Sequence, residues 1–429
     1  MQMNIETLHT YFLKSTGVCT DTRAIKEGCL FFCLKGANFN GNKFAQDALD
    51  KGARFAIIDE NQYHKNTGQT ILAHDSLELL QQLATYHRLY LKTPIIALTG
   101  SNGKTTTKEL INVVLSQKYN TTATQGNLNN HIGVPLTLLS ITSDTEIGIV
   151  EMGANHLNEI AQLSNLVLPD YGYITNFGKA HLEGFGSLDG VIQGKTELYR
   201  HLQHRNKLAF VNTNDSKQIE HAREIDSIRF GNTAEDTCIE LMEATNYLKV
   251  RFKNTDIQSN LIGAYNYSNI AAAIAIGNYF GVSIKEIKRA IETYIPINNR
   301  SQLIKRGSNT IILDAYNANP TSMLAALENV NQAEGKNKVL FLGDMFELGP
   351  DAQEEHQNIV NFIEENNIGH TYLIGEHFAK ARTNSSEIYK FQSFEGLKTQ
   401  LKDNPPTNSF ILIKASRGMA LERVLELFK

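Results

Sequence analysis

The chain is poor in the residues that mark several special classes of protein. Among its 429 residues there is no tryptophan, and there are only eight prolines and four cysteines. The four cysteines lack the spacing of a metal site, and two of them, Cys29 and Cys33, lie in an apolar segment. We therefore expect buried free thiols and no disulfide framework. Free thiols are typical of a reducing compartment, and we expect the protein in the cytoplasm.

Neither an excess of one charge nor a long apolar run is present. The 41 basic residues nearly balance the 45 acidic ones and leave a net charge of −4, so we do not expect nucleic acid as a partner. The first residues show no basic region followed by an apolar one, and no signal peptide is expected. No apolar run approaches the roughly 18 residues that a membrane span needs.

The length predicts several domains, because 429 residues are too many for one core. The helical and strand patterns break at Thr93-Pro94 and again near Ile295–Arg300. We predict three domains: 1–92, 93–297 and 298–429. From Pro94 onward apolar runs alternate with helical patterns, which is typical of a parallel α/β sheet. The alternation restarts in the last part, which predicts a small doubly wound α/β domain.

The expected strands are short apolar runs, at residues 30–34, 55–58, 94–98, 147–151, 171–175, 208–211, 310–313, 339–342, 372–374 and 410–413. Helices are expected over residues 77–91 and from Thr321, Ala352 and Met419. A further helix is expected over residues 271–276, whose small side chains would let another element approach closely.

The segment from Thr99 to Thr106 is the most informative stretch of the chain. It follows an apolar run and opens a segment with helical periodicity, so glycines and backbone amides gather where a helix begins. Lys104 would neutralise the β- and γ-phosphates of a nucleotide, and the Thr105 hydroxyl would ligate Mg²⁺. The usual pattern G-x-x-x-x-G-K-[ST] lacks its first glycine here, because Leu98 holds that place. A plain polar turn is the alternative, but the flanking strand and helix favour an ATP site that comprises Gly100, Ser101, Asn102, Gly103, Lys104, Thr105 and Thr106.

Three further residues downstream could carry chemistry. Glu151 closes an expected buried strand, at the sheet edge where ligands bind in α/β proteins, and its carboxylate suits Mg²⁺; a solvated turn residue is the alternative. His181 follows another strand and is either a surface histidine or a second metal ligand. Lys195 lies in a helical context, where a solvated lysine paired with a glutamate is the plainer interpretation.

Together and in this order, these segments resemble the muramyl ligase family, the ATP-dependent Mur ligases. The resemblance spans nearly the whole chain. Its marks are residues 20–23, 30–32, 35–36, 99–107, 126–130, 133–137, 151–153, 175–183, 314–320, 342–345, 347–349 and 416–418. The Tyr-Asn-Ala-Asn-Pro run at 316–320 and the Leu-Gly-Asp-Met run at 342–345 are more specific to the branch that adds D-alanyl-D-alanine.

The resemblance implies an architecture and an activity. It implies a first domain that holds a uridine diphosphate, a central ATP-binding domain and a third domain that closes on the nucleotide. The implied reaction joins D-alanyl-D-alanine to the terminal carboxylate of UDP-N-acetylmuramoyl-tripeptide through an acyl phosphate, with ATP and Mg²⁺. Catalysis is assigned to Lys104, His181 and Lys195. A carbamylated Lys195 would be an anion that holds a second Mg²⁺ with Glu151 and His181. We expect a monomer.

The resemblance also implies binding roles for polar residues. Asn266 or Asn269 would contact the base, Arg300 and Asp314 the ribose or phosphates, and Asn317 and Asn319 would complete the adenine pocket. Each of these residues has a cap or turn role as its alternative, and Asn-Ala-Asn-Pro suits a strand-to-helix turn without any ligand. The residues implied in substrate binding are Thr22, Arg23, Lys35, Asn127, Asn130 and Phe346, with Phe346 and Glu347 as candidates for contact with D-alanyl-D-alanine.

The sequence departs from the family pattern in three places, of which the first two concern particular substrate or adenine contacts and the third adds only one methyl group. Asn40-Gly41-Asn42 replaces Asp-Gly-His near the uridine site, Tyr265 replaces a histidine before the adenine-side asparagine, and Ala415 replaces a glycine. The alternatives to the implied activity are the ligase that adds the third amino acid, a folylpolyglutamate synthase, and a nucleotide-binding subunit without catalysis. The acidic balance disfavours a fourth class, a nucleic-acid-dependent ATPase.

Overall fold

The computed structural model describes residues 3–65, 68–234, 236–244, 247–333, 337–402 and 404–428. The chain forms two compact units by its internal contacts. The first consists of Met1–Leu98, Tyr119–Gly153 and Glu159–Gly172, and the second of Thr99–Lys118, Ala154–Asn158 and Tyr173–Lys429. Within the described ranges, every helix is too short or too polar to cross a bilayer.

The beginning of the first unit is a small parallel sheet with helices. Its strand order is β1 (Val18–Cys19), β2 (Leu30–Phe32), β5 (Phe55–Ile58) and β6 (Thr70–Leu72). A two-stranded ribbon, β3 (Lys35–Gly36) with β4 (Phe39–Asn40), follows β2. The helices are α1 (Ile5–Leu13), α2 (Ala45–Asp50) and α3 (Ser76–Leu91).

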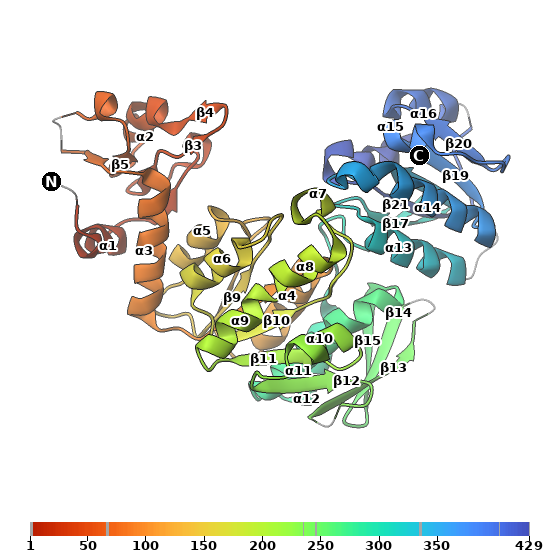
Figure 1. Cartoon of the computed structure of the whole chain (residues 1–429), viewed down its shortest axis with the longest axis horizontal. Helices are drawn as coiled ribbons and strands as arrows, with labels where there is room; N and C mark the ends of the chain where they lie inside the picture. The colour runs from red at the N-terminus through yellow and green to blue at the C-terminus, as the bar shows by residue number, and fades with distance from the viewer. Residues whose placement is uncertain are drawn as a thin grey trace. The chain divides into compact units, whose positions relative to one another are not determined.

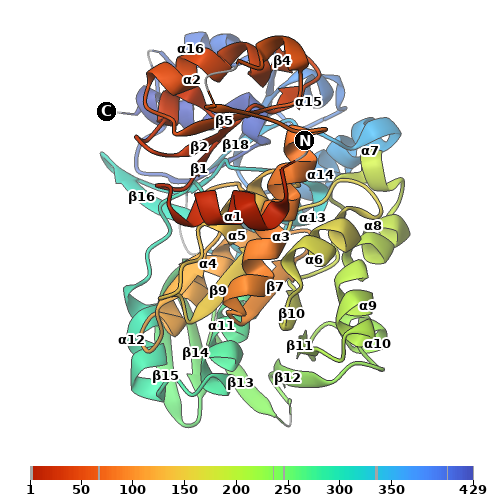
Figure 2. The same cartoon turned by 90° about the vertical axis from the view of Figure 1, so that its left-hand side faces the viewer.

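The helix α3 begins and ends where the sequence indicates. Asp75 caps it by accepting hydrogen bonds from the amides of Leu77 and Glu78, and it ends at Lys92 in a left-handed conformation ahead of Pro94. Figure 2 shows α1 lying against α3. Cys29 and Cys33 are buried free thiols, as expected.

The rest of the first unit contains parallel strands and the helices that accompany them. β7 (Ile95–Thr99) pairs with β9 (Ile147–Glu151), and β9 pairs with β8 (Thr121–Ala123). Every residue of β7 and β9 is buried, which is typical of parallel strands covered on both faces. The helices here are α5 (Gly133–Leu139) and α6 (Glu159–Val167).

The second unit starts with α4 (Lys104–Leu115) and continues after β10 (Tyr171–Ile174). Its strands β11 (Leu208–Asn212), β12 (Ser227–Gly231) and β13 (Thr237–Glu243) are parallel. β14 (Tyr247–Phe252) and β15 (Thr255–Ile262) then run antiparallel. We expected parallel alternation from Pro94 onward, and this antiparallel meander was not predicted.

Helices accompany these strands, and some of them lie beside β11 (Figure 1). The helices are α7 (Leu182–Phe185), α8 (Leu188–Lys195), α9 (Glu197–His204), α10 (Ser216–His221), α11 (Tyr267–Tyr279) and α12 (Ile284–Thr293). α11 contains the run of small residues and packs against α4. A Cβ atom added at Gly277 would overlap the Val114 side chain of α4, so the close approach expected from the sequence is confirmed.

The last part of the second unit is a doubly wound domain, as predicted. Its sheet has the order β16 (Gln302–Arg306), β17 (Asn309–Asp314), β21 (Phe410–Lys414), β18 (Lys338–Gly343), β19 (His370–Ile374) and β20 (Ile388–Phe391). Only β16 among these strands is antiparallel to its neighbour. Alternate strand residues such as Ile311, Phe341 and Ile413 pack against α16 (Phe394–Leu401).

The other helices of this domain are α13 (Pro320–Gln332), α14 (Ala352–Asn366) and α15 (Glu376–Lys380). Figure 1 shows α13 and α14 side by side. The α-helix expected from Met419 is wrong: the structure has two 3₁₀ segments, η6 (Arg417–Met419) and η7 (Leu421–Leu427). Ala420 between them is left-handed, with φ 47°, and this conformation interrupts helical hydrogen bonding.

Candidate functional site

The predicted phosphate loop is the turn between β7 and α4. Gly100 and Gly103 have φ of 143° and 78°, values that residues with a Cβ atom rarely adopt. A Cβ atom at Gly100 would overlap Thr175 Oγ1, and one at Gly103 would lie 2.5 Å from Asn269 Oδ1. The turn therefore requires glycine at both positions.

Lys104 begins α4 and folds over this turn. Its Nζ donates to the carbonyl oxygens of Gly100 and Ser101, at 2.7 and 3.3 Å. Thr105 and Thr106 follow in the first turn of the helix and are buried. A helix start that carries an ammonium group and backbone amides favours the binding of phosphate.

A second segment, residues 175–178 after β10, holds the loop in place. The amide of Ser101 donates to Asn176 O at 3.1 Å, and that of Asn102 donates to Asn176 Oδ1 at 3.0 Å. Ser101 Oγ donates to Gly178 O and accepts from Gly178 N, both at 2.9 Å. Thr175 Oγ1 donates to Asn102 O at 2.6 Å. The loop is thus shaped by the protein itself, which lowers the cost of ordering it around a ligand.

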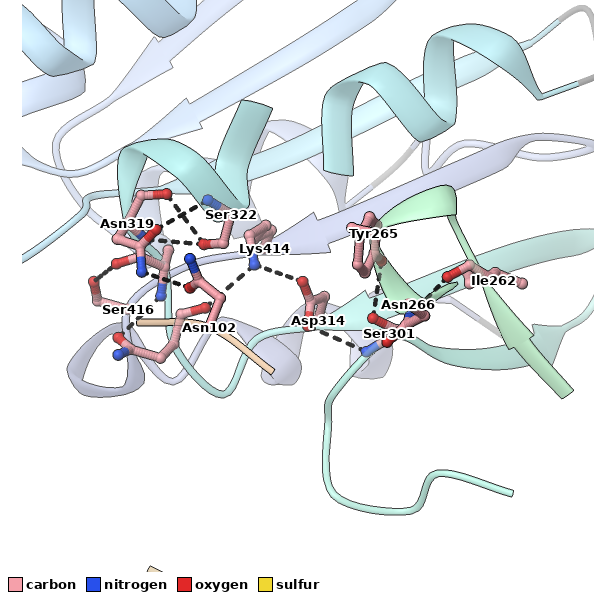
Figure 3. A network of polar contacts seen from close by, with 12 residues as sticks. Asn102, Ile262, Tyr265, Asn266, Ser301, Asp314, Asn319, Ser322, Lys414 and Ser416 are labelled. Atoms are coloured by element: carbon pink, nitrogen blue, oxygen red, sulfur yellow. Dashed lines mark hydrogen bonds and ion pairs between the residues drawn. The ribbon is translucent and has the colours of Figure 1, made fainter. Parts of the chain in front are cut away.

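The C-terminal domain contacts the loop through Asn319 (Figure 3). Asn319 Nδ2 donates to Asn102 Oδ1 at 2.7 Å. Its Oδ1 accepts from Ser322 N at 2.9 Å and completes a capping box at the start of α13. One side chain therefore caps a helix and reaches the phosphate loop.

A polar network around Asp314 lies beside this contact (Figure 3). Asp314 Oδ2 accepts from Lys414 Nζ at 2.5 Å, and its Oδ1 accepts from Ser301 N at 3.1 Å. Tyr265 OH hydrogen-bonds Ser301 Oγ at 2.9 Å. Burial, together with the negative charge of Asp314, raises the pKa of Tyr265 above its ordinary value, so this phenol stays protonated.

Positive charge gathers at one aromatic ring nearby. The guanidinium carbon of Arg300 lies 3.7 Å from the centroid of Tyr316, and that of Arg417 lies 5.6 Å from it. Arg300 Nε is buried, and no described residue accepts its hydrogen bond. Two guanidinium groups on one ring form a surface that suits an anionic ligand.

The asparagines predicted to contact adenine are engaged within the protein. Asn266 Nδ2 donates to Ile262 O, and Asn269 Nδ2 donates to Asn266 Oδ1, both at 2.8 Å. Asn269 Oδ1 accepts from Thr107 Oγ1 at 2.9 Å. Asn317 Oδ1 accepts from Ala318 N at 2.9 Å. These contacts give the asparagines structural roles of the kind that the sequence left open.

Glu151 ends β9 in the first unit and is buried. Its Oε1 accepts from Asn129 Nδ2 at 2.8 Å. Its Oε2 is buried without a hydrogen-bond partner among the described residues. A buried carboxylate oxygen that lacks a donor is costly, and a cation would satisfy it. The residue therefore fits the predicted magnesium ligand.

His181 and Lys195 lie in the second unit. His181 precedes α7 with φ 54°, and its Nδ1 hydrogen-bonds Glu347. Lys195 ends α8 and is buried, with Nζ 3.1 Å from Ala154 O and 5.0 Å from the centroid of Phe185. The solvated lysine of the plainer interpretation is therefore wrong.

No three His, Cys, Asp or Glu side chains of the described ranges gather as a metal site. A divalent ion would need other ligands as well. The Thr105 hydroxyl, phosphate oxygens and a modified Lys195 are the ones that the sequence predicts.

The residues predicted to bind substrate in the first unit have protein partners. Arg23 pairs with Asp21 at 2.6 Å, and its hydrogen bonds lower the pKa of Asp21 to about 2. Lys35 pairs with Asp59 at 3.2 Å. Asn130 Oδ1 accepts from two amides at the start of α5, at 3.1 and 2.9 Å.

The remaining predicted substrate residues are Thr22, Asn127 and Phe346. Thr22 begins a 3₁₀ turn, and Asn127 O accepts from Asn129 N at 2.8 Å. The Phe346 side chain in the second unit is exposed. At residues 40–42, where the sequence departs from the family pattern, Asn42 is buried, and its Nδ2 donates to Asp59 Oδ1 at 2.8 Å.

Three contacts of the site were not predicted from the sequence, although Asn102 itself was predicted as part of the ATP site. They are the pairing of Lys414 with Asp314, the hydrogen bond from Asn129 to Glu151, and the one from Asn319 to Asn102 Oδ1. Asn102 and Asn129 lie in runs that carried the family resemblance, and Lys414 lies two residues before the last of these runs, so position in or beside the runs was the available signal.

Family models of the Mur ligases match most of the chain. Residues 98–277 match the Mur ligase middle domain, 299–417 the Mur ligase glutamate ligase domain, and 14–88 the Mur ligase family catalytic domain. The UDP-N-acetylmuramoyl-tripeptide–D-alanyl-D-alanine ligase of Bacillus subtilis (strain 168) is 35% identical over 96% of this chain and 92% of its own length. The ligase of the same name from Escherichia coli (strain K12) is 33% identical over 95% and 92%.

Solved structures of related proteins have the same fold. A crystal structure of MurF from Acinetobacter baumannii superposes with a TM-score of 0.86 at 29% identity and covers 99% of this chain and 98% of its own. The MurF ligase of Thermotoga maritima in complex with ADP gives a TM-score of 0.85 at 25% identity and covers 97% of both chains. The predicted three-domain architecture is confirmed.

Proposed function

The chain belongs to the Mur ligase family, and we propose that it joins D-alanyl-D-alanine to the terminal carboxylate of UDP-N-acetylmuramoyl-tripeptide with ATP. The observation that carries the proposal is the near full-length similarity to ligases named for this reaction. The glycine-dependent phosphate loop and Lys104 supply the nucleotide chemistry that the reaction needs.

The reaction has two steps. The tripeptide carboxylate attacks the γ-phosphorus of ATP, and the bond from that phosphorus to the bridging oxygen breaks. ADP departs, and the tripeptide now carries an acyl phosphate. The neutral amine of D-alanyl-D-alanine then attacks the acyl carbon, phosphate leaves with the C–O bond electrons, and the amine proton passes to solvent or a base. Repulsion between a carboxylate and a polyphosphate opposes the first step, so positive charge at the phosphates is the main requirement.

The residues around the phosphate loop meet that requirement. Lys104 moves its hydrogen bonds from the loop carbonyls to the phosphates, and the amides at the start of α4 hold the same oxygens. The segment at residues 175–178 keeps the loop from collapsing. Arg300 and Arg417 add positive charge at the ring of Tyr316. Fixed donors need no reorganisation during the reaction, and this is how such sites lower barriers.

We propose Mg²⁺ as the metal cofactor, held by Thr105 and, at a second site, by Glu151, His181 and a carbamylated Lys195. The buried oxygen of Glu151 that lacks a donor supports a cation there. Bound Mg²⁺ would neutralise phosphate charge. The first proposed substrate site comprises residues of the first unit, namely Thr22, Arg23, Lys35, Asn127 and Asn130, and Phe346 would contact the dipeptide.

The domain boundaries stay those of the sequence prediction, at residues 92–93 and 297–298. We propose that the protein acts as a cytoplasmic monomer on small-molecule substrates. Sedimentation of the purified protein with and without ATP tests the monomer, and a dimer in either condition would contradict it.

The experiment that tests the function measures phosphate release from ATP and Mg²⁺ with UDP-N-acetylmuramoyl-tripeptide, with and without D-alanyl-D-alanine. We expect release only with both, and a pentapeptide product by mass spectrometry. Release with a dipeptide precursor and a diamino acid, or with a folate and glutamate, would assign the protein to a sister branch. Absence of release with every acceptor would leave a nucleotide-binding subunit.

A further inference from the structure

The ring of His181 contacts a carboxylate from a distant part of the chain. Its Nδ1 hydrogen-bonds Glu347 Oε2. Glutamate is ionised at neutral pH and can only accept, so the imidazole Nδ1 carries the hydrogen. In the neutral imidazole, the Nε2 atom then has its lone pair.

The same two segments meet again through the backbone. Glu183 N donates to Glu347 O at 3.1 Å. Gly349, with φ 56°, lies against Glu183, where an added Cβ atom would be 3.4 Å from the Glu183 Cα. His181 and Glu347 both have left-handed backbones, with φ of 54° and 61°, an uncommon state for residues other than glycine. The backbone contacts between residues 181–183 and 347–349 therefore hold both residues in conformations in which their side chains meet.

We propose that Glu347 is a positioning residue for the ligase reaction: it fixes the His181 ring in the Nδ1–H form and thereby presents Nε2 to a divalent cation. The metal part of this inference rests on the proposed function, whereas the tautomer part does not. Histidines that bind metals characteristically donate their other N–H to a carboxylate, which sets the tautomer and raises the basicity of the ligating nitrogen.

Because His181 precedes α7 and Glu347 follows β18, the ring is held only while these two segments are docked. A second contact between the same regions, the ion pair of Lys179 Nζ with Glu355 Oε1 at 2.5 Å, does not touch the imidazole. It offers a matched control, since its loss weakens docking without removing the acceptor of Nδ1–H.

The first test reads the tautomer directly in the full-length protein without metal. Histidine is labelled with ¹⁵N, spectra are recorded at pH 8.5, and the His181 signal among the 13 histidines is assigned by its loss in His181→Gln. We expect a protonated Nδ1 in the wild type and in Glu347→Gln, whose amide oxygen can still accept. In Glu347→Ala we expect the proton to move largely to Nε2, whereas Glu355→Ala keeps the wild-type form.

The second test counts free Mn²⁺ by electron paramagnetic resonance, in titrations of each variant with ADP present. Loss of a ligand's hydrogen-bond partner typically weakens metal binding by about 10- to 100-fold, and we expect this loss for Glu347→Ala with partial recovery in Glu347→Gln. Thermal unfolding of each variant identifies any that fails to fold, and Glu347→Gln keeps the comparison possible because both substitutions leave a side chain on the same left-handed backbone.

A wild-type ring that carries its proton on Nε2, or a Glu347→Ala spectrum identical to wild type, would overturn the positioning role. A shifted tautomer with unchanged Mn²⁺ binding would overturn the metal part and remove His181 from the proposed ligand set. Failure of the ligase assay with every acceptor would reject the proposed function and leave the tautomer result in force.

Discussion

Lys104 carries the largest expected effect of any single side chain. Its ammonium group donates to the loop carbonyls of Gly100 and Ser101. Its removal takes away the positive charge that would neutralise the phosphates and leaves the glycine turn intact. We expect Lys104→Ala to lower kcat for phosphate release by about 10²- to 10³-fold, the loss typical for one preorganised donor.

The control for this substitution is Lys118→Ala. Lys118 lies beyond the end of α4 and donates to the carbonyl oxygens of Phe280 and Gly281. Like Lys104 it is a lysine that donates to backbone carbonyls, but it is not part of the phosphate loop. Phosphate release at the wild-type rate in Lys104→Ala would contradict the role of Lys104.

Asn269 distinguishes a structural role from contact with the base. It accepts from Thr107 and donates to Asn266 in a buried setting, and Asn269→Ala would leave both partners unpaired. We expect the free energy of unfolding, measured with urea, to fall by about 1–3 kcal/mol. Asn278→Ala on the same helix, where the side chain is partly exposed and accepts from Lys253, should change it by less than about 0.5 kcal/mol.

A raised KM for ATP with unchanged stability in Asn269→Ala would instead favour the adenine contact that the family resemblance implies. The sequence could name Asn269 but not decide between these roles, because hydrogen-bond partners such as Thr107 are far away in the chain. The same holds for Lys414 and Asp314, which are brought together by the pairing of β17 with β21.

At the scale of elements, strands with strong apolar runs were predictable and polar strands were not. β5 and β9 match their predicted ranges, because burial of most of their residues leaves a nearly continuous apolar run in the sequence. β14 alternates buried and less buried residues, a period-two signal that the sequence contains at Leu248, Val250 and Phe252. It was missed because the neighbouring β13 is mostly exposed and weakly patterned.

The packing of α1 on α3 contains a pair of buried histidines. His9 Nε2 and His87 Nδ1 are 3.0 Å apart, and His87 Nε2 lies 2.8 Å from Ile141 O. The carbonyl accepts from His87 Nε2–H, and in the neutral form of this ring His87 Nδ1 then accepts from His9 Nε2–H. Tyr86 and Tyr90 lie edge-on against His9.

These histidines should make stability depend on pH. Burial lowers the pKa of both His9 and His87, so the unfolded chain binds more protons once the pH falls below about 6.5, the ordinary value for histidine. Urea unfolding should therefore show stability that is full near pH 7.5, falls as pH drops through this value, and stops falling below the folded-state pKa.

The glutamine variant His9→Gln tests this dependence, because its amide can still donate to His87 but does not titrate. We expect a shallower slope of unfolding free energy between pH 7 and 5 than in the wild type. His74→Gln, at an exposed histidine of the same unit, should leave the slope unchanged. Equal slopes in His9→Gln and wild type would contradict the role of the pair.

At the scale of the whole molecule, the resemblance found in the sequence predicted the three-domain architecture because its marks are spread along the full chain. It did not show how the C-terminal domain contacts the phosphate loop, since that contact depends on the position of individual side chains. Asn319 supplies it, because one amide group caps α13 with its oxygen and reaches Asn102 with its nitrogen.

The serine variant Asn319→Ser separates these two functions. Serine is as good a helix cap as asparagine but is too short to reach Asn102, so we expect unfolding free energy within about 0.5 kcal/mol of wild type. The lost hydrogen bond, worth about 1 kcal/mol, should lower kcat/KM for ATP about fivefold. The matched variant Ser322→Ala removes the other half of the capping box and keeps the contact with Asn102, so its kcat/KM should stay near wild type while its stability falls. Equal kcat/KM in Asn319→Ser and Ser322→Ala would mean that Asn319 acts on the nucleotide site only through the start of α13, and that its bond to Asn102 does not couple the C-terminal domain to the phosphate loop.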